Sequence, residues 1–248
     1  MTMGASSTRL RFSSPPWGEG KWSKLTARLL GLCLGFAAIG AAHADKVGVA
    51  AAVNPDAFSS LSGSPQTQLN IGKSIFFNER INTTTSGLVQ VLLVDGSTFT
   101  VGPGSDLVID RFVYDPNKKS GEVVASFSKG VMRFVGGKIS KNEGGVVVNT
   151  PSGALAIRGG MFQTNGKVYS FLFGENMTLT GKNGQQYTVF QPGNSIDTSG
   201  GTPTIRPTTQ ADINSVMAQL TNGNTGGATT TTQGPPSKSW SRRLTCKT

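Results

Sequence analysis

The stretch "VLLVDGSTFTVGPGSDLVID", Val91 to Asp110, places Asp95, Gly96 and Ser97 between two apolar runs. An aspartate beside a serine is compatible with catalytic machinery, but Ser97 has no third partner nearby to act as a base. Asp-Gly between "VLLV" and "TFTV" is a strong signal for a short β-hairpin. The stretch therefore predicts a turn between two strands.

Similar turn signals recur about every ten residues, among them "GPGS", "DPNKKSG", "NEGG", "TPSG", "RGG" and "KNGQ". The short runs between them are rich in valine, isoleucine, phenylalanine and threonine, which favours strands. "VQVLLV" and "VVV" are apolar on both faces, whereas "KVYSFLF" alternates, with Tyr169, Phe171 and Phe173 expected on one face. We expect an all-β fold, a single domain of many short strands with sandwich-like or β-solenoid-like stacking.

The first 44 residues have the composition of a secretory leader. Basic residues precede the apolar run Leu29 to Ala42, which is shorter than the ~20 residues of a membrane-spanning helix. Ala42 and Ala44 have the spacing that signal peptidase accepts, so cleavage after Ala44 and a periplasmic or secreted product starting at Asp45 are predicted. A retained membrane anchor is the alternative. "RFSSPPWGEGKW" at 11–22 is unusual for a leader and indicates a true start codon downstream of Met1.

The rest of the chain divides into four predicted segments. Residues 45–68 form an N-terminal segment in which "VGVAAAVNPDAFSSL" is ambiguous between a strand and a short helix, with Pro55 breaking it. Residues 69–205 form the β domain. Residues 206–220 contain a short helix, because Thr209 and Asp212 resemble a capping box and an apolar stripe follows. Residues 221–248 have almost nothing to bury and are predicted to be disordered.

The net charge of +10 is concentrated outside the β domain. The leader and the segment after Leu220 each carry a net +4, which leaves +2 for the domain. A nucleic-acid-binding domain usually carries a basic stripe on its folded part. The sequence therefore disfavours a nucleic-acid partner.

The composition also removes several enzyme classes. The one histidine, His43, lies in the leader, and after cleavage Cys246 is the one remaining cysteine. Histidine-based triads, histidine zinc sites and an intrachain disulfide are therefore excluded for the mature chain. We predict no enzyme, no catalytic residues, no cofactor and no metal site; Lys118 and Lys119 also disfavour a calcium loop at "DPNKKSG".

Carboxylates and aromatic residues remain as candidates for other chemistry. The carboxylates mostly lie at expected turns, where their side chains bond to the local backbone; they are Asp56, Glu79, Asp95, Asp106, Asp110, Asp115, Glu122, Glu143, Glu175, Asp197 and Asp212. The candidate binding aromatics are Phe76, Phe77, Phe112, Tyr114, Tyr169 and Tyr187, each of which fits a core position better than a binding surface.

The order of the motifs resembles the FecR domain family. That family shows an apolar strand into Asp-Gly-Ser, a strand into Gly-Pro, a Gly-Val-x-Phe strand, and a Thr-Pro-x-Gly turn before a glycine pair. The resemblance runs from about Leu69 to Asp197, and Gly160 departs from it where the family commonly has threonine. The matching residues are Asp95, Gly96, Ser97, Gly102, Pro103, Ser105, Leu107, Gly130, Val131, Phe134, Thr150, Pro151, Gly153, Gly159 and Phe162.

The resemblance implies an extracytoplasmic all-β module of the kind found in regulators that sense an outer-membrane receptor. It brings no catalytic residues, and the 28 residues before Leu29 are too few for the family's cytoplasmic anti-sigma segment. We therefore expect a binding or sensing module for a protein or glycan partner in the bacterial envelope, with no stable membrane span after leader cleavage. A structural or self-associating envelope or matrix protein is the alternative, and the oligomeric state stays open.

Overall fold

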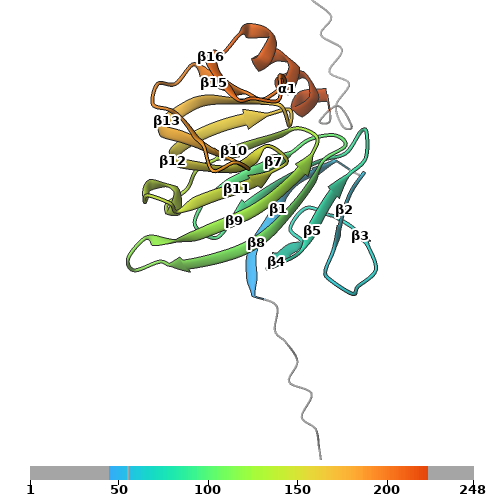
Figure 1. Ribbon diagram of the computed structural model, residues 1–248. Coiled ribbons are helices and arrows are strands. Elements are labelled where there is room, and N and C mark those ends of the chain that lie inside the picture. Colours follow the sequence, from blue (N-terminus) through green and yellow to red (C-terminus); the bar gives the residue numbers. More distant parts are fainter. Residues whose placement is uncertain (1–44, 55, 223–248) are drawn as a thin grey trace, which may run out of the picture. The chain divides into compact units, whose positions relative to one another are not determined.

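The computed structural model describes residues 45–54 and 56–222. The predicted leader at 1–44 and the predicted disordered tail beyond residue 222 lie outside the described residues. Within them the fold is all-β with one short helix, as expected from the turn pattern, and the strands form a single curled sheet (Figure 1). No helix in this part of the chain is long and apolar enough to span a membrane.

Most strands are short and follow one another through tight turns. The first eight are β1 (Lys46–Asn54), β2 (Ala57–Ser60), β3 (Thr67–Gln68), β4 (Ser74–Phe76), β5 (Arg80–Thr83), β6 (Leu88–Leu93), β7 (Thr98–Val101) and β8 (Asp106–Asp115). The others are β9 (Ser120–Lys129), β10 (Met132–Val135), β11 (Val146–Thr150), β12 (Gly153–Thr164), β13 (Val168–Gly181), β14 (Gln186–Val189), β15 (Asn194–Asp197) and β16 (Thr204–Pro207). A 3-10 turn, η1 (Ile139–Lys141), and the helix α1 (Gln210–Asn222) complete the described elements.

The sheet has the order β3-β2-β5-β8-β9-β11-β12-β10-β7-β6-β1-β4, with β13 joining β14, β15 and β16 to β12. All described pairs are antiparallel except β9 with β11. The ambiguous segment at the start is therefore strand: β1 pairs with both β6 and β4. Pairing on both sides satisfies the backbone of β1, and its apolar residues Val47 and Ala50 are buried in the core.

The core lies along one face of the sheet. Phe99, Phe134 and Phe162 follow one another on β7, β10 and β12, with ring centroids 4.9 and 5.8 Å apart. Phe171 on β13 continues this ladder opposite Phe162. All four are fully buried, so the aromatic ladder fixes the register of these four strands.

The predicted alternation in "KVYSFLF" is wrong at its last position. Tyr169 and Phe171 are buried, but Phe173 is 68% exposed. The pairing of β12 with β13 shifts between Met161 and Phe162, so that Phe171 lies opposite Phe162 and Phe173 opposite Met161. Such a β-bulge turns the following side chain to the other face.

The predicted closing helix is confirmed, although it begins and ends later than 206–220. Thr209 and Asp212 form the predicted capping box: Thr209 N donates to Asp212 Oδ2 at 2.8 Å, and Asp212 N donates to Thr209 Oγ1 at 3.2 Å. Residues 206 and 207 end β16, because Arg206 and Pro207 pair with β15. The last turn of α1 continues through residues 221 and 222, which the sequence had placed in the tail.

Candidate functional site

The Asp-Gly-Ser motif is a buried link between two parts of the fold. The predicted turn is confirmed, with Gly96 at a φ of 88°. The Asp95 carboxylate accepts hydrogen bonds from Ser97 N at 3.0 Å, Ser97 Oγ at 2.7 Å and Ile139 N at 3.2 Å. Gly137 N donates to Ser97 Oγ at 2.9 Å. The side chains of Asp95 and Ser97 therefore both hydrogen-bond the backbone of the segment that follows β10.

The Gly-Pro-x-Ser motif makes a second buried link. Ser105 Oγ donates to Val131 O at 3.0 Å and accepts from Val131 N at 2.9 Å. Thr83 Oγ1 donates to Gly102 O at 2.6 Å and accepts from Ser105 N at 2.9 Å. Gly130 has a φ of 96°, and a Cβ there would lie 2.1 Å from Ser105 Oγ. Glycine is required at this contact.

The Thr-Pro-Ser-Gly motif forms a hairpin turn between β11 and β12. Thr150 Oγ1 donates to Gly153 O at 2.8 Å and accepts from the Tyr169 hydroxyl at 2.9 Å. A Cβ at Gly153 would lie 2.2 Å from Thr180 O. The family motif residues of these three segments are thus occupied by structural contacts, and none of the contacts presents a reactive group to a ligand.

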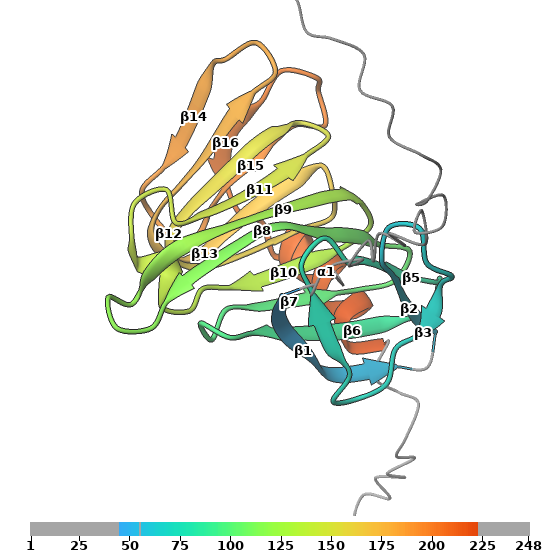
Figure 2. The ribbon, with the colours of Figure 1, turned by 90° about the horizontal axis from the view of Figure 1, so that it is seen from below.

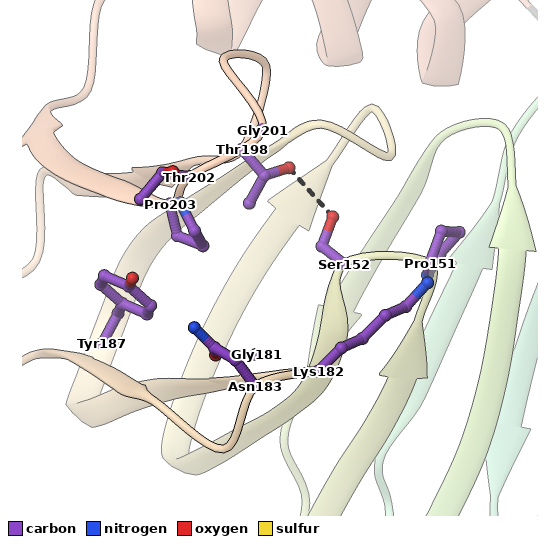
Figure 3. A pocket seen from close by; sticks show the side chains of 10 residues that line it. All are labelled: Pro151, Ser152, Gly181, Lys182, Asn183, Tyr187, Thr198, Gly201, Thr202 and Pro203. Atoms are coloured by element: carbon purple, nitrogen blue, oxygen red, sulfur yellow. Dashed lines mark hydrogen bonds between the residues drawn. The ribbon is translucent and has the colours of Figure 1, made fainter.

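A polar crevice lies beside this hairpin (Figure 3). It has a volume of about 390 Å³ and is lined by Ser152, Lys182, Asn183, Tyr187 and Thr198 with neighbouring glycines and prolines. Ser152 and Thr198 share a hydrogen bond of 3.0 Å across it. Hydroxyl and amide groups around one aromatic ring suit a small polar ligand.

The helix α1 packs against Arg133 on β10 and Gln163 on β12, which alternate with Phe134 and Phe162 and therefore point away from the aromatic ladder. Figure 2 shows α1 beside β10. Gln163 Nε2 donates to Ile213 O at 3.3 Å, and the Arg133 guanidinium donates to Gln163 Oε1 at 2.7 Å and to the Met217 sulfur. Arg133 Nε is buried and has no hydrogen-bond acceptor among the described residues. Burial lowers the pKa of the Arg133 guanidinium.

Two carboxylates hold the start of α1 to the sheet through one arginine. Arg206 Nε donates to Asp197 Oδ2 at 2.8 Å, and its other nitrogens bind both oxygens of Asp212 at 2.7 and 3.0 Å. These hydrogen bonds lower the pKa of the Asp212 carboxyl and raise that of Arg206. The pKa of Asp197 is lowered by the backbone N–H of Ser199 and by Arg206.

An apolar row lies next to α1 on the same face of the sheet. Val135 lies two positions after Arg133 on β10, and its cross-strand partner Met161 lies two positions before Gln163 on the antiparallel strand β12, so all four share a face. Cross-strand pairs continue this row over five strands. The apolar row is defined here as four apolar residues and one threonine, namely Leu92, Thr98, Val135, Met161 and Phe173. Leu92 and Val135 are 40% and 41% exposed. Thr98 and Met161 are half-buried.

A groove of about 530 Å³ runs along the Phe173 end of the apolar row. Glycines form its floor because two strands approach closely there: a Cβ at Gly160 would lie 1.9 Å from Phe173 O, and one at Gly174 would lie 2.2 Å from Gly159 O. Lys141 and Glu175 also line the groove. Glu175 Oε2 lies 2.9 Å from Arg158 Nε.

The candidate aromatics do not gather in one place. Tyr169 is fully buried, while Phe112, Tyr114 and Tyr187 are partly buried and packed against the core. Phe77 lies in the turn after β4 and is 43% exposed, and Phe76, the last residue of β4, is half-buried. Sequence reasoning missed the exposed position of Phe173, although the glycines at 159, 160 and 174 were a signal for a bulge.

The titratable side chains of the described residues mostly serve the fold. Within residues 45–54 and 56–222, no three acidic, histidine or cysteine side chains lie close enough to hold a metal ion. Among the sequence-derived carboxylates, Asp95 and Asp106 are buried and serve hydrogen bonds or ion pairs of the fold, Asp106 with Arg80.

The protein is therefore an all-β domain in which the motif residues hold the fold together. Residues 79–171 match the family model described as FecR protein, in agreement with the resemblance that the order of the motifs indicated. The match is shorter than the expected span of 69–197 but includes all three linked motifs. Domains of this family are generally non-enzymatic sensing or regulatory modules.

Other comparisons are more distant. No curated protein matches the chain. Two crystal structures of a "putative anti-sigma factor" from Parabacteroides distasonis are similar, with 16% and 15% identity and TM-scores of 0.45 and 0.43. Each similarity covers 56% of this chain, and the chain spans 63% and 64% of the two structures.

Proposed function

We propose that the protein is an exported, non-enzymatic binding module of the bacterial envelope that docks a protein partner on the face formed by α1 and the apolar row. One observation carries the proposal: the family motif residues are used in internal contacts, whereas Phe173, Val135 and Leu92 are exposed along one row of cross-strand pairs, with Met161 and Thr98 between them. Large exposed apolar patches on soluble proteins usually mark sites of interaction with a partner.

A protein partner fits this face better than a glycan. The groove beside Phe173 is larger than the polar crevice of Figure 3 and is lined mainly by apolar side chains and glycines. Large apolar side chains at the centre of a face supply most of the binding energy in protein interfaces. Export is supported by the leader composition, with Asp45 as the proposed mature start.

In-cell crosslinking tests the proposal. The full chain with a C-terminal tag is expressed in its host, the periplasm is treated with a crosslinker, and captured proteins are identified by mass spectrometry; amino-terminal sequencing of the same product tests cleavage after Ala44. A specific envelope protein and a start at Asp45 are expected. Recovery from the cytosol, or no protein that depends on the folded domain, would count against the proposal.

Self-association as a structural component is the second candidate. The edge strand β16 pairs with β15 alone, and its Ile205 is 48% exposed. Exposed edges with apolar side chains promote pairing between copies. If this function holds, an Ile205→Lys variant is expected to lose assemblies that the wild-type chain forms, and unchanged assemblies would exclude this edge.

A further inference from the structure

We propose that the polar crevice of Figure 3 binds a sugar acid, that is, a pyranose ring that carries a carboxylate. The crevice shares no lining residue with the face formed by α1 and the apolar row, so this site is independent of the proposed protein partner. The ligand is a free sugar acid or one unit of an acidic polysaccharide, since both present the same ring and the same carboxylate.

Three hairpin turns converge to form the crevice. They are the turns between β11 and β12, between β13 and β14, and between β15 and β16. Ser152 in the first turn and Thr198 in the third share a hydrogen bond of 3.0 Å, and the second turn contributes Lys182 and Asn183. Each turn is also closed by hydrogen bonds of its own. The crevice is therefore formed before a ligand enters, as small-molecule sites usually are.

Internal hydrogen bonds orient the polar groups of the crevice and leave each with a free side. Asn183 Oδ1 accepts from Gln185 N at 3.0 Å, and the amide nitrogen of Asn183 has no acceptor among the described residues. Thr198 Oγ1 donates to Lys167 O at 2.7 Å, so the Ser152 hydroxyl supplies the proton of the bond that joins it to Thr198. Ser152 Oγ therefore keeps an acceptor lone pair. Sugar hydroxyls, which both donate and accept, match this combination.

The Tyr187 ring forms the apolar wall of the crevice. The ring is half-buried and packs against the core, so its orientation is fixed. Figure 3 shows it across the crevice from Ser152 and Thr198. One face of a pyranose ring consists mainly of C–H groups, which pack on the face of an aromatic ring, while the hydroxyls at its edge bind polar groups. This arrangement fits a sugar better than a small inorganic anion.

The charge of the crevice favours an acid. Lys182 is the one charged side chain among the lining residues, and it forms no ion pair within the described part of the chain. The Asp197 carboxylate, next to Thr198 in the sequence, is already bound by Arg206 Nε at 2.8 Å and by Ser199 N at 2.9 Å. A ligand carboxylate therefore gains a charge-assisted hydrogen bond from Lys182 that a neutral sugar lacks.

The size of the crevice limits the ligand to a small one. Its volume of about 390 Å³ is near the lower end of the range of about 300–1,000 Å³ that small-molecule pockets have. One aromatic ring and a few polar groups bind a single sugar weakly, and a dissociation constant of about 1 mM is expected.

NMR titration of the full chain, purified from its host with ¹⁵N labelling, tests the site through its backbone amides. D-Galacturonate is the probe, D-galactose is the neutral sugar with the same ring, and acetate is a carboxylate without a ring. Galacturonate is expected to shift the amides of residues 181–187 and 198–202 with a dissociation constant of about 1 mM. Galactose is expected to bind about tenfold more weakly, and acetate is expected to leave these amides unshifted.

Two variants test the groups that carry the site. Asn183→Asp keeps an oxygen that accepts from Gln185 N but loses the amide donor and repels the ligand carboxylate, so galacturonate binding is expected to weaken at least about tenfold. Lys182→Gln is expected to weaken galacturonate binding about tenfold and to leave galactose binding unchanged. Lys129→Gln is the matched control, since Lys129 is exposed on β9 and lies outside the crevice. The amide spectrum of each variant checks that its fold is retained.

Several results would overturn the proposal. They are crevice amides that do not shift at about 30 mM galacturonate, shifts of equal size with acetate, equal affinities for galacturonate and galactose, and equal effects of Lys182→Gln and Lys129→Gln. When galacturonate binds as expected, its linear trimer distinguishes the two sources of the ligand. Tighter binding of the trimer assigns the site to a unit of an acidic polysaccharide, and equal or weaker binding assigns it to a free sugar acid.

The sugar site and the protein-binding face fail or succeed separately. Phe173 and Val113 are 68% and 55% exposed and lie outside the crevice, Phe173 in the apolar row and Val113 on the β8–β9 hairpin. Phe173→Asp and its matched control Val113→Asp are both expected to leave galacturonate binding unchanged. Loss of partner capture with intact galacturonate binding therefore concerns the proposed function alone.

Discussion

The carboxylate of Asp95 lies 3.2 Å from the backbone nitrogen of Ile139, which is 44 residues later in the chain. This contact joins the turn between β6 and β7 to the segment after β10. The same segment contributes Gly137 and Lys141 to the groove beside Phe173. The Asp-Gly-Ser motif therefore positions one wall of the proposed binding face.

Loss of the Asp95 carboxylate is predicted to destabilise the domain. Asp95→Asn removes the charge that strengthens three hydrogen bonds, and a loss of about 2 kcal/mol in the free energy of unfolding is expected. Asp115→Asn is the control, because Asp115 caps an exposed turn that asparagine also tolerates. Urea denaturation measures both. Equal losses in the two variants would show that Asp95 is an ordinary turn residue.

Gly130 is predicted to be intolerant of any side chain. Gly130→Ala combines a φ of 96° with a Cβ that would lie 2.1 Å from Ser105 Oγ, so a loss of more than about 2 kcal/mol is expected. At Gly200 a Cβ would meet nothing within 4 Å, and Gly200→Ala is expected to be neutral. Thermal unfolding compares the two, and a stable Gly130→Ala variant would refute the proposed role of the Ser105 link.

The attachment of α1 is predicted to weaken in acid. Asp212 and Asp197 have pKa values lowered from the ordinary value of 3.8. A carboxyl whose pKa is depressed in the folded state stabilises that state above its unfolded pKa, and this contribution is lost as the pH falls towards the folded pKa. The hydrogen-exchange protection of residues 210–222, relative to unprotected amides at the same pH, is therefore expected to fall below about pH 4, before the sheet opens.

A substitution separates this effect from general acid unfolding. Asp212→Asn is expected to show fast exchange in α1 already at neutral pH and little further change in acid, because the titrating group is gone. Glu143→Gln is the control, since Glu143 is exposed and distant in sequence from α1. If Asp212→Asn retains the wild-type acid response, Arg206 does not anchor the helix through Asp212.

Local patterns in the sequence were sufficient for much of this fold. Asp95-Gly96-Ser97 predicted the β6–β7 turn, and Thr209 with Asp212 predicted the start of α1, because both depend on residues within one turn of chain. The bond from Asp95 to Ile139 was not predictable, since it joins segments whose proximity depends on the whole sheet. The N-terminal segment stayed ambiguous because its partners, β6 and β4, lie far along the chain.

The candidate binding face was missed for a related reason. Period-two alternation predicted that Phe173 lies on the same face as Tyr169 and Phe171. The bulge between β12 and β13 turns the Phe173 side chain to the opposite face. A bulge depends on the register of two strands and not on either strand alone. The apolar row combines five strands, so no single segment of the sequence displays it.

The central claim is that the face formed by α1 and the apolar row binds a protein partner. The most direct measurement is partner capture in the periplasm by the wild-type chain, Phe173→Asp and Val113→Asp, at equal expression and with folding verified. The account predicts capture by the wild type and Val113→Asp and loss of capture with Phe173→Asp. Equal capture by all three chains would contradict it and would place the partner elsewhere on the domain.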